Sequence, residues 1–404
     1  MAQKLTKKQL VNIANQFGTP VYVYHAEKIA EQYHKLVNAF ADCNSRFFYA
    51  CKALTNINIL KLMKSLGASL DCVSINEVKL GLKVGFEPTE ILFTPNCVDL
   101  EEIEEGKNLG VHINIDNISF LEQFGNKYGD TYPVCIRLNP HIMAGGNYKI
   151  STGHIDSKFG ISIHQLRHIE RIVKSTKLNV TGLHMHTGSE IKDINVFLEG
   201  LEVMFDLARH FDNLQFIDLG SGFKVPYQQG DPETDVNQLG GKVADAFKAF
   251  EKETRKKIQV WFEPGKYLVS EAGYFVVKTN VIKQTTATVF VGVNSGFNHL
   301  IRPMFYEAFH QIENISNPKG AERIYTVVGN ICETDTFAWD RTLNEVREGD
   351  LLVFYNAGAY GFEMSSNFNS RLKPAEVLVK DNKPYLIRRR DEFDDLLRNQ
   401  LEVL

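Results

Sequence analysis

The chain has 404 residues, which exceeds one ordinary domain and indicates a large barrel or sandwich with a second domain beside it. Hydrophobic residues at 44% and charged residues at 23% are typical of a globular protein in water. With 45 basic and 49 acidic residues, the net charge of −4 argues against broad electrostatic binding to nucleic acid. We see no signal peptide and no apolar run long enough to span a bilayer, so we expect a cytoplasmic protein without a membrane partner.

The first two thirds of the chain alternate short apolar runs with amphipathic stretches. The candidate strands are residues 47–51, 69–73, 91–94, 111–115, 133–138, 180–185, 216–219 and 259–262. Helical patterns lie between them, for example at 58–66 and 201–208. Alternation of this kind predicts a parallel sheet, and eight repeats predict a (β/α)₈ barrel. The first strand is not followed by Gly-x-Gly-x-x-Gly, which weakens a dinucleotide-binding alternative.

After Ala272 the sequence changes to segments rich in Val, Ile, Tyr, Phe and Thr, which predict a mostly β domain. Its candidate strands are residues 274–282, 288–293, 323–328, 350–355 and 375–379, with a hairpin turn at 381–384 and a closing helix at 392–401. The early run Pro20–Tyr24 also has strand character, and we expect it to join this domain. The predicted domains are therefore a barrel at 27–273 and a β domain built from 1–26 and 274–404.

The six cysteines are scattered, and none forms a Cys-x-x-Cys pair, so a metal ribbon or a disulfide framework is not expected. Five of them lie in apolar or strand-like segments and are predicted to be small core residues. These five are Cys43, Cys51, Cys72, Cys97 and Cys135.

Ionisable residues gather where the barrel strands are predicted to end, and in such a barrel the carboxyl ends of the strands carry the functional groups. Lys52 ends the first apolar run. If buried, its amine would have a lowered pKa and could act as a nucleophile that forms a Schiff base. The alternative is a strand-end lysine whose methylenes reach solvent.

Three other strand ends allow two interpretations each. The loop Gly220–Gly222 suits an anion such as phosphate, or is a plain tight turn. Glu263 could hold a heteroaromatic nitrogen protonated, or form an ordinary salt bridge. His184 and His186 have the spacing of a metal pair on a strand, with Asp218 as a further ligand. An amine and a glycine loop fit a metal hydrolase poorly, so we expect an imidazole lying against an aromatic cofactor and no metal.

Together these residues resemble the fold-type III pyridoxal-phosphate decarboxylases, most closely their diaminopimelate decarboxylase branch, over nearly the whole chain. In the barrel the matching motifs are Tyr49-Ala50-Cys51-Lys52-Ala53, Gly182–Ser189, Asp218–Phe223 and Glu263-Pro264-Gly265-Lys266. In the second domain they are Arg302–Tyr306, Cys332-Glu333, Ala357–Tyr360 and Met364–Asn369. The resemblance implies an alanine-racemase-like two-domain plan with pyridoxal 5′-phosphate as the cofactor.

The resemblance also implies a role for each residue. Lys52 would hold the cofactor as a Schiff base, His186 would stack on its ring, and Glu263 would pair with the ring nitrogen. The phosphate would be held by Gly222, Ser189, Gly265 and Tyr360, with Lys266 as a further cofactor or substrate contact.

The implied substrate contacts lie mostly in the second domain. They are Arg302, Tyr306, Glu333, Tyr360 and Lys266, with Glu333 facing the distal ammonium group. Cys332 would protonate the substrate carbon after CO₂ leaves. In the family, Cys332 and Glu333 reach the cofactor of the neighbouring subunit, so the resemblance implies a homodimer with shared active sites.

Four positions depart from the family pattern. Lys266 replaces an arginine and loses the bidentate fork, which leaves open whether it contacts phosphate, substrate or both. Ser221 replaces a glycine, which is tolerable if its φ stays negative. Asn330 stands where proline is common, and Asp335 lies one place earlier than the usual aspartate.

The implied activity is decarboxylation of meso-2,6-diaminopimelate to L-lysine and CO₂, the last step of lysine biosynthesis. A related decarboxylase of ornithine, arginine or carboxynorspermidine would share the cofactor apparatus without recognising a distal carboxylate. An alanine-racemase-like enzyme would need a tyrosine base where Cys332 stands. A non-catalytic pyridoxal-phosphate carrier would have the barrel alone.

Overall fold

A computed structural model describes residues 3–142, 157–188 and 193–404 of the chain. The chain forms two compact units. The first consists of residues 1–31, 226–231 and 268–404, and the second of residues 32–225 and 232–267. A search of the described residues finds no helix with the length and apolar character needed to cross a membrane.

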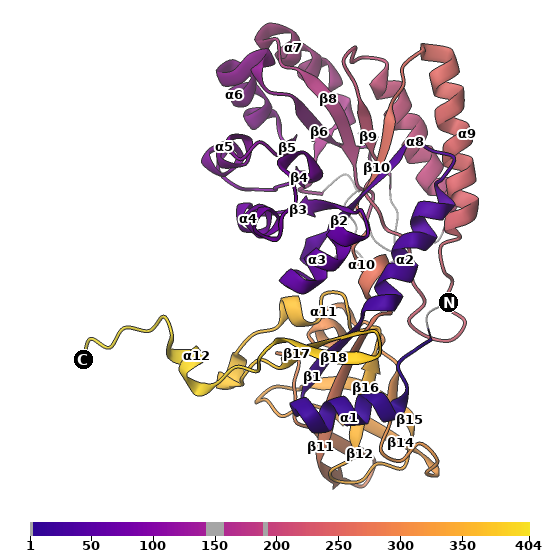
Figure 1. The fold of residues 1–404 in the computed structure, drawn as a ribbon, viewed down its shortest axis with the longest axis vertical. Helices are drawn as coiled ribbons and strands as arrows, with labels where there is room; N and C mark the ends of the chain where they lie inside the picture. Colours follow the sequence, from indigo (N-terminus) through magenta and orange to yellow (C-terminus); the bar gives the residue numbers. More distant parts are fainter. Residues whose placement is uncertain (1–2, 143–156, 189–192) are drawn as a thin grey trace. The chain divides into compact units, whose positions relative to one another are not determined.

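The second unit contains a closed ring of eight parallel strands (Figure 1). In ring order these are β2 (Ser45–Ala50), β3 (Ser69–Cys72), β4 (Ile91–Phe93), β5 (His112–Ile115), β6 (Val134–Asn139), β8 (Val180–Met185), β9 (Phe216–Asp218) and β10 (Gln259–Phe262). Pairing of β10 with β2 closes the ring, and the short β7 (Ile161–Ser162) adds to β6. The predicted (β/α)₈ barrel is therefore confirmed.

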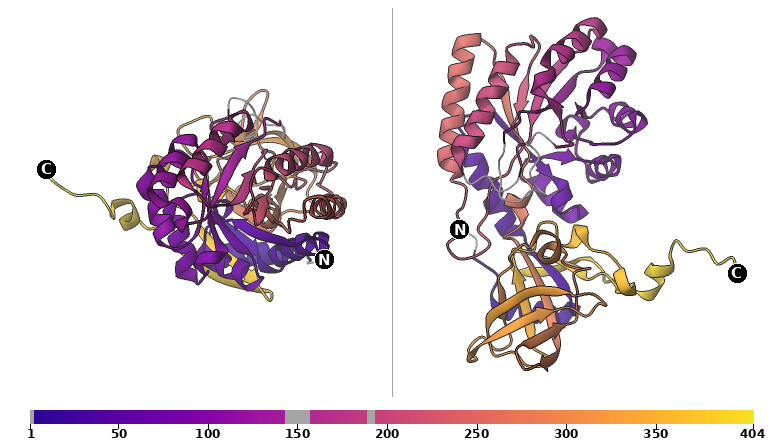
Figure 2. Two further views of the ribbon diagram at one scale, coloured as in Figure 1. Left: turned by 90° about the horizontal axis from the view of Figure 1, so that it is seen from above. Right: turned by 180° about the vertical axis from the view of Figure 1, so that it is seen from behind.

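Helices surround the ring, as the view from above shows (Figure 2). They are α2 (Ala26–Ala39), α3 (Ile57–Ser65), α4 (Ile75–Val84), α5 (Leu100–Asn108), α6 (Ile118–Tyr128), α7 (Leu166–Thr176), α8 (Ile194–Ala208), α9 (Val236–Thr254) and the short α10 (Lys266–Val269). Local sequence fixes several of their ends. The Ser74 side chain caps the start of α4, and Gly85 ends it in the left-handed conformation.

The barrel interior has an apolar layer toward the amino ends of its strands. Phe216 and Trp261 stack there with ring centroids 3.5 Å apart. A Cβ on Gly182 would lie 2.1 Å from the Phe216 ring, so only glycine fits beside that ring. The interior turns polar toward the carboxyl ends of the strands. Its buried polar side chains there include Asp71, Asn114, Arg137, His184, Asp218 and Glu263.

The first unit is built on a nine-stranded sheet. Its strands are β1 (Val21–His25), β11 (Gly273–Gln284), β12 (Val289–Val293), β13 (Ile312–Asn314), β14 (Glu322–Val328), β15 (Thr336–Asn344), β16 (Leu351–Tyr355), β17 (Ala375–Lys380) and β18 (Lys383–Arg388). Strand β1 pairs antiparallel with β11 and parallel with β17, as expected for the early run of strand character. The N-terminal segment thus supplies a central strand of a sheet otherwise built from the last third of the chain.

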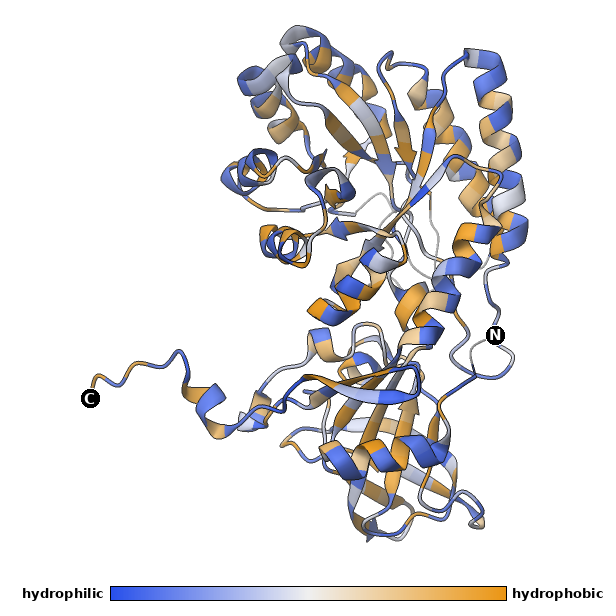
Figure 3. Ribbon diagram, in the orientation of Figure 1, coloured by the Kyte–Doolittle hydropathy of each residue, from blue (hydrophilic) through white to orange (hydrophobic). Residues whose placement is uncertain are grey.

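Three helices complete this unit: α1 (Lys7–Phe17), α11 (Arg302–Tyr306) and α12 (Phe393–Leu397). Leu10, Ile13 and Ala14 of α1 pack into one apolar cluster with Val21 and Val23 of β1. Figure 3 shows the two-sided character of α1, with hydrophilic and hydrophobic residues alternating along it. Burial of this apolar stripe holds the helix on the sheet.

The hairpin turn at 381–384 is present, because Asp381 and Asn382 both have positive φ between β17 and β18. Strands β13, β15 and β18 were not predicted, and the closing helix is shorter than expected. Much of β15 and β18 is exposed, so neither strand has the apolar pattern on which the prediction depended.

The core assignment of the cysteines is partly wrong. Cys51, Cys72 and Cys135 are buried as expected, whereas Cys43 is half-buried and Cys97 is exposed. Cys97 lies beyond the end of β4 with a positive φ of 56°, in a loop rather than in a strand.

Candidate active site at the carboxyl ends of the barrel strands

Lys52 forms an ion pair at the mouth of the barrel. It lies in a 3₁₀ helix, Cys51–Ala53, that directly follows β2. Its Nζ is 2.9 Å from Oδ2 of the buried Asp71, whose Oδ1 accepts a 2.6 Å hydrogen bond from Thr94. The Lys52 side chain is 38% exposed, which agrees with the alternative of a strand-end lysine that reaches solvent rather than with a fully buried amine. Pairing with Asp71 fixes the amine, and its exposure leaves it accessible.

Glu263 follows β10, and its neighbours inside the barrel stabilise the ionised form of its carboxyl group. Its Oε2 lies 3.2 Å from Nε2 of the fully buried His184, while Oε1 is buried with no hydrogen-bond partner in the described part of the chain. Burial alone raises the pKa of this carboxyl. The charge and hydrogen bond of His184, together with the charge of Lys52, outweigh burial and lower the pKa to about 2. Glu263 is therefore ionised and has one oxygen available as an acceptor.

Asp218, at the end of β9, has a raised rather than a lowered pKa. Burial, followed by the charge of Glu263, raises its pKa well above the usual range, although Gly220 N–H donates a 2.8 Å hydrogen bond to Oδ1. Donor atoms of His184, Asp218 and Glu263 lie within 4.8 Å of one another, which is metal-site spacing. His184 is already bonded to Glu263, and a carboxyl that favours its proton is a poor ligand. The absence of a metal remains a prediction.

His186 lies against the glycine loop rather than in that cluster. The backbone N–H of Ser221 donates to its Nδ1 at 3.3 Å, which places the ring proton of the neutral imidazole on Nε2. Burial, together with the charge of Arg137, lowers the pKa of His186 to about 3. His186 is therefore neutral near pH 7, as a ring that packs on an aromatic group should be.

The glycine loop needs its glycines. Gly220 has φ +63°, and a Cβ there would lie 2.4 Å from Nδ1 of His186. Gly222 has φ +111°, whereas Ser221 does not have a positive φ, so the serine is tolerated as expected. Gly265 packs its Cα face on Ala50 and Ala53, which brings the start of α10 close to Lys52. Lys266 is the first residue of that helix, and Ser189 lies outside the described residues.

In the first unit, Arg302 is buried at the start of α11, where neighbouring side chains contact its guanidinium. His310 donates from Nδ1 to the carbonyl of Tyr355 at 2.9 Å, so the Nε2 of the neutral ring carries no proton and accepts the 3.4 Å hydrogen bond from Arg302 Nε. The guanidinium carbon also lies 5.4 Å from the ring centroid of Tyr227 and 6.0 Å from that of Tyr306. A guanidinium offers planar N–H donors that suit a carboxylate, and these contacts hold the Arg302 side chain in place.

The other predicted residues of this unit lie in loops. Tyr360 follows a run of small residues and has a positive φ of 56°. Cys332 and Glu333 are both exposed within their own unit, in the loop between β14 and β15. Exposed side chains within a sequence motif are typical of residues that act on another molecule, which docks on the surface that carries them.

Several residues that organise the site were not among the predicted site residues, although His184 was considered as half of a metal pair. Asp71 and Thr94 hold Lys52, His184 holds Glu263, and His310 orients Arg302. The available signal was a charged or polar residue inside an otherwise apolar strand, since such a residue needs a buried partner. Arg137 of β6 gives the same signal, and its guanidinium lies over the Phe159 ring at 4.7 Å.

Comparison with known proteins agrees with this geometry. Residues 26–270 match the family model of the pyridoxal-dependent decarboxylases, pyridoxal binding domain. The chain is 37% identical to the diaminopimelate decarboxylase of Methanothermobacter thermautotrophicus over 96% of its own length and 93% of the relative's. The corresponding Campylobacter jejuni enzyme is 34% identical, with 95% and 96% covered.

A solved structure of diaminopimelate decarboxylase from Helicobacter pylori complexed with L-lysine superposes with a TM-score of 0.89 at 30% identity, covering 96% of this chain and 98% of that one. Full-length similarity at this level includes both units and not the barrel alone. The chain therefore belongs to the pyridoxal-dependent decarboxylases and, among them, to the diaminopimelate decarboxylase family.

Proposed function

We propose that this protein decarboxylates meso-2,6-diaminopimelate to L-lysine and CO₂, with pyridoxal 5′-phosphate as its cofactor. The observation that carries the proposal is the full-length similarity to enzymes of that name, found in a chain whose barrel holds an ionised Glu263 beside an accessible Lys52. The Helicobacter pylori structure is a complex with L-lysine, which is the product expected here.

The residues of the barrel fit the cofactor. The buried Oε1 of Glu263 has no partner among the described residues, so an ionised acceptor is available for the N–H of a pyridinium ring. Gly220 and Gly222 have positive φ and no Cβ, so backbone N–H groups of this loop are accessible to a phosphate. Pyridoxal phosphate supplies an electron-poor ring that draws off the electrons of the breaking Cα–carboxylate bond.

Each barrel residue then has one task. Lys52 would hold the cofactor through its amine, and Asp71 would fix and balance the charge of that amine whenever it is free. The neutral imidazole of His186 would pack on the cofactor ring, and the ionised Glu263 would favour a protonated ring nitrogen. The phosphate is held by Gly222, Gly265, Tyr360 and Ser189, the last of which lies outside the described residues.

The second set of residues recognises the substrate. Diaminopimelate has a second, unreacted centre with an amine and a carboxylate, and each needs an opposite charge. Arg302, fixed by His310, binds the carboxylate, and Glu333 binds the ammonium group. Tyr306, which lies beside Arg302, and Tyr360 each supply a hydroxyl group. Lys266 supplies a positive charge to the phosphate or to the substrate.

Cys332 Sγ delivers the proton to the carbon that has lost CO₂. Exposure of Cys332 and Glu333 within their own unit supports action on the site of a second subunit, so we also propose a homodimer with shared active sites. In this proposal residues 27–273 bind the cofactor and the remainder forms the substrate-binding domain. The enzyme would work in the cytoplasm, where its cofactor and substrate are made available.

The test is turnover by the purified protein with added pyridoxal phosphate. Meso-diaminopimelate should yield L-lysine and CO₂ in equal amounts, and borohydride should fix the cofactor to the peptide that contains Lys52. A Lys52→Ala protein that turns over at the wild-type rate, or labelling at another lysine, would overturn the assignment.

A further inference from the structure

Asn369 makes two hydrogen bonds to one residue, Cys332. Its Oδ1 accepts from the backbone N–H of Cys332 at 2.9 Å, and its Nδ2 donates to the Cys332 Sγ at 3.1 Å. The orientation of the amide is not arbitrary. A backbone N–H is only a donor, so it must face the amide oxygen, which leaves the NH₂ group facing sulfur.

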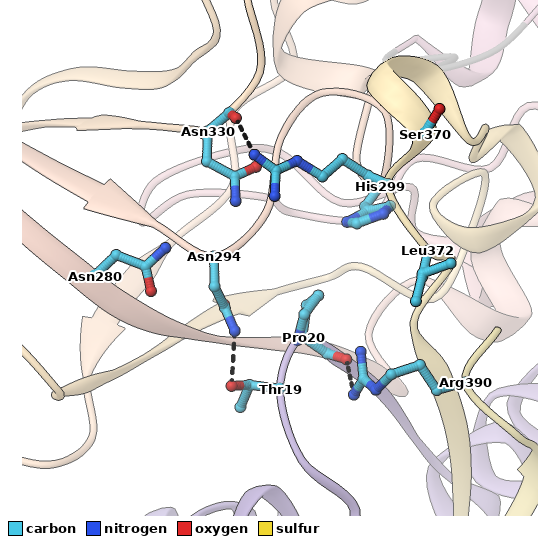
Figure 4. Close-up of a pocket in the computed structure, with 10 residues that line it drawn as sticks. Thr19, Pro20, Asn280, Asn294, His299, Asn330, Ser370, Leu372 and Arg390 are labelled. Carbon is cyan, nitrogen blue, oxygen red and sulfur yellow. Dashed lines mark hydrogen bonds between the residues drawn. The ribbon is translucent and has the colours of Figure 1, made fainter. Parts of the chain in front are cut away.

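The segment that carries Asn369 is shaped to reach the cysteine loop. Asn369 has φ 56° and ψ 27°, a left-handed conformation that asparagine tolerates better than most side chains. Two residues later, Arg371 Nη2 donates to the carbonyl of Asn330 at 2.9 Å, the bond marked by the dashed line at the labelled Asn330 in Figure 4. The contacts to Cys332 and Asn330 therefore come from one short stretch of chain.

The cysteine loop is anchored at both ends as well. Asn330 N–H donates to the carbonyl of Ser295 at 2.9 Å, and Gly329 N–H donates to the carbonyl of Asp335 at 2.7 Å. The buried Asp335 in turn accepts from Phe297 N–H at 2.7 Å. Asn330 and Arg371 also line a pocket of about 390 Å³, so open space lies beside this part of the loop. These contacts hold the backbone of the loop, and Asn369 fixes the position of the Cys332 side chain on it.

We propose that Asn369 is a positioning residue for proton delivery by Cys332. This inference rests on the proposed function, in which the S–H bond breaks and a C–H bond forms at the carbon that lost CO₂. The electron pair of the S–H bond stays on sulfur as a thiolate, which solvent later reprotonates. Because Nδ2–H occupies one side of the sulfur as a donor, the S–H proton points away from Asn369. The same N–H stabilises the thiolate as it forms.

Asn369→Asp is the sharpest variant, because it keeps an acceptor for the Cys332 N–H and tolerates the same backbone conformation. It replaces the N–H donor at sulfur by a carboxylate oxygen, which disfavours the thiolate. Asn382→Asp is the matched control, because Asn382 is exposed, has φ 58° in the hairpin turn, and undergoes the same chemical change.

The first readout needs no cofactor: the rate of Cys332 alkylation by iodoacetamide from pH 6 to 10, followed by peptide mass spectrometry. A Cys97→Ser background removes the other exposed thiol. Asn369→Asp should slow alkylation at pH 7 by about 10-fold, because a carboxylate oxygen beside the sulfur disfavours the reactive thiolate. Asn382→Asp should match the parent protein.

The second readout is kcat for diaminopimelate, which should fall about 10-fold in Asn369→Asp while KM changes by less than about 2-fold. An unchanged alkylation profile, or an unchanged kcat, would overturn the role of Asn369. Failure of the proposed function gives a different result: the parent protein would then not turn over diaminopimelate, whatever the alkylation of Asn369→Asp shows.

Discussion

His184 Nε2 lies 3.2 Å from Oε2 of Glu263, and both side chains are buried among the polar groups of the barrel interior. The contact uses one carboxylate oxygen and leaves the other without a partner in the described structure. An uncompensated buried carboxylate would take up a proton, so His184 is what keeps Glu263 an anion. In the proposed function, the negative charge that Glu263 offers to the ring nitrogen thus depends on His184, which need not touch the cofactor.

Glu263→Gln should retain the cofactor but lower kcat on the order of 10²-fold, because a neutral amide no longer favours the protonated ring. His184→Asn should lower kcat by about 10-fold, which corresponds to the loss of one hydrogen bond to a charged group. Steady-state kinetics on cofactor-saturated protein measures both. Near-normal turnover of Glu263→Gln would show that the carboxylate is only structural.

The positions at which the strands end were predictable from the sequence, whereas the side-chain contacts between those ends were not. Strands β8 and β10 have the predicted bounds because apolar runs bounded by polar residues mark buried parallel strands. Since the carboxyl ends of such strands converge, the grouping of Lys52, His186 and Glu263 followed from the sequence. The bonds of Glu263 to His184 and of Lys52 to Asp71 depend on the register of a closed barrel, which single strands do not encode.

Other misses have local causes. The β15 strand runs half exposed, and Asp340 within it has a positive φ of 46°, so its pattern of apolar residues is interrupted. The apolar neighbours of Lys52 left both a buried and an exposed amine open, and the partial exposure follows from its place in a 3₁₀ turn after the strand. Asn369 carries no signal of its own, since its role depends on a loop 37 residues away in sequence.

The low pKa of His186 predicts a dependence of stability on pH. The folded pKa is about 3, against about 6.5 in the unfolded chain, so the unfolded state binds more protons between these values. The free energy of unfolding should therefore fall as pH is lowered from 7 toward 4. His186→Asn should reduce that slope by up to about one proton, measured by denaturant unfolding of cofactor-free protein. An identical slope in wild type and variant would contradict the assignment.

Gly182 and Gly241 give a matched pair of Gly→Ala substitutions. Gly182→Ala should destabilise the barrel by about 1–3 kcal/mol, because its Cβ would lie 2.1 Å from the Phe216 ring. Gly241 lies within α9, and a Cβ there meets nothing within 4 Å. Gly241→Ala should therefore stabilise by about 0.5–1 kcal/mol. Equal denaturation midpoints for the two variants would show that the interior relaxes around Phe216 without cost.

The shared site of the proposed homodimer can be tested by mixing inactive subunits. Lys52→Ala and Cys332→Ala proteins, mixed under conditions in which subunits exchange, should recover about a quarter of wild-type activity, since half the dimers are hybrids with one intact site. Lys52→Ala mixed with the double variant should recover none. If exchange is demonstrated by mass spectrometry and no activity returns, Cys332 does not act in the partner's site.

The most direct test of the account is a competition between substrates. The purified enzyme, saturated with pyridoxal phosphate, is given equimolar meso-diaminopimelate, ornithine, arginine and lysine, and the loss of each is followed. The account predicts that kcat/KM for meso-diaminopimelate exceeds the others by orders of magnitude, because a substrate without the distal carboxylate leaves Arg302 unpaired. Preference for ornithine, arginine or lysine would contradict the proposed specificity.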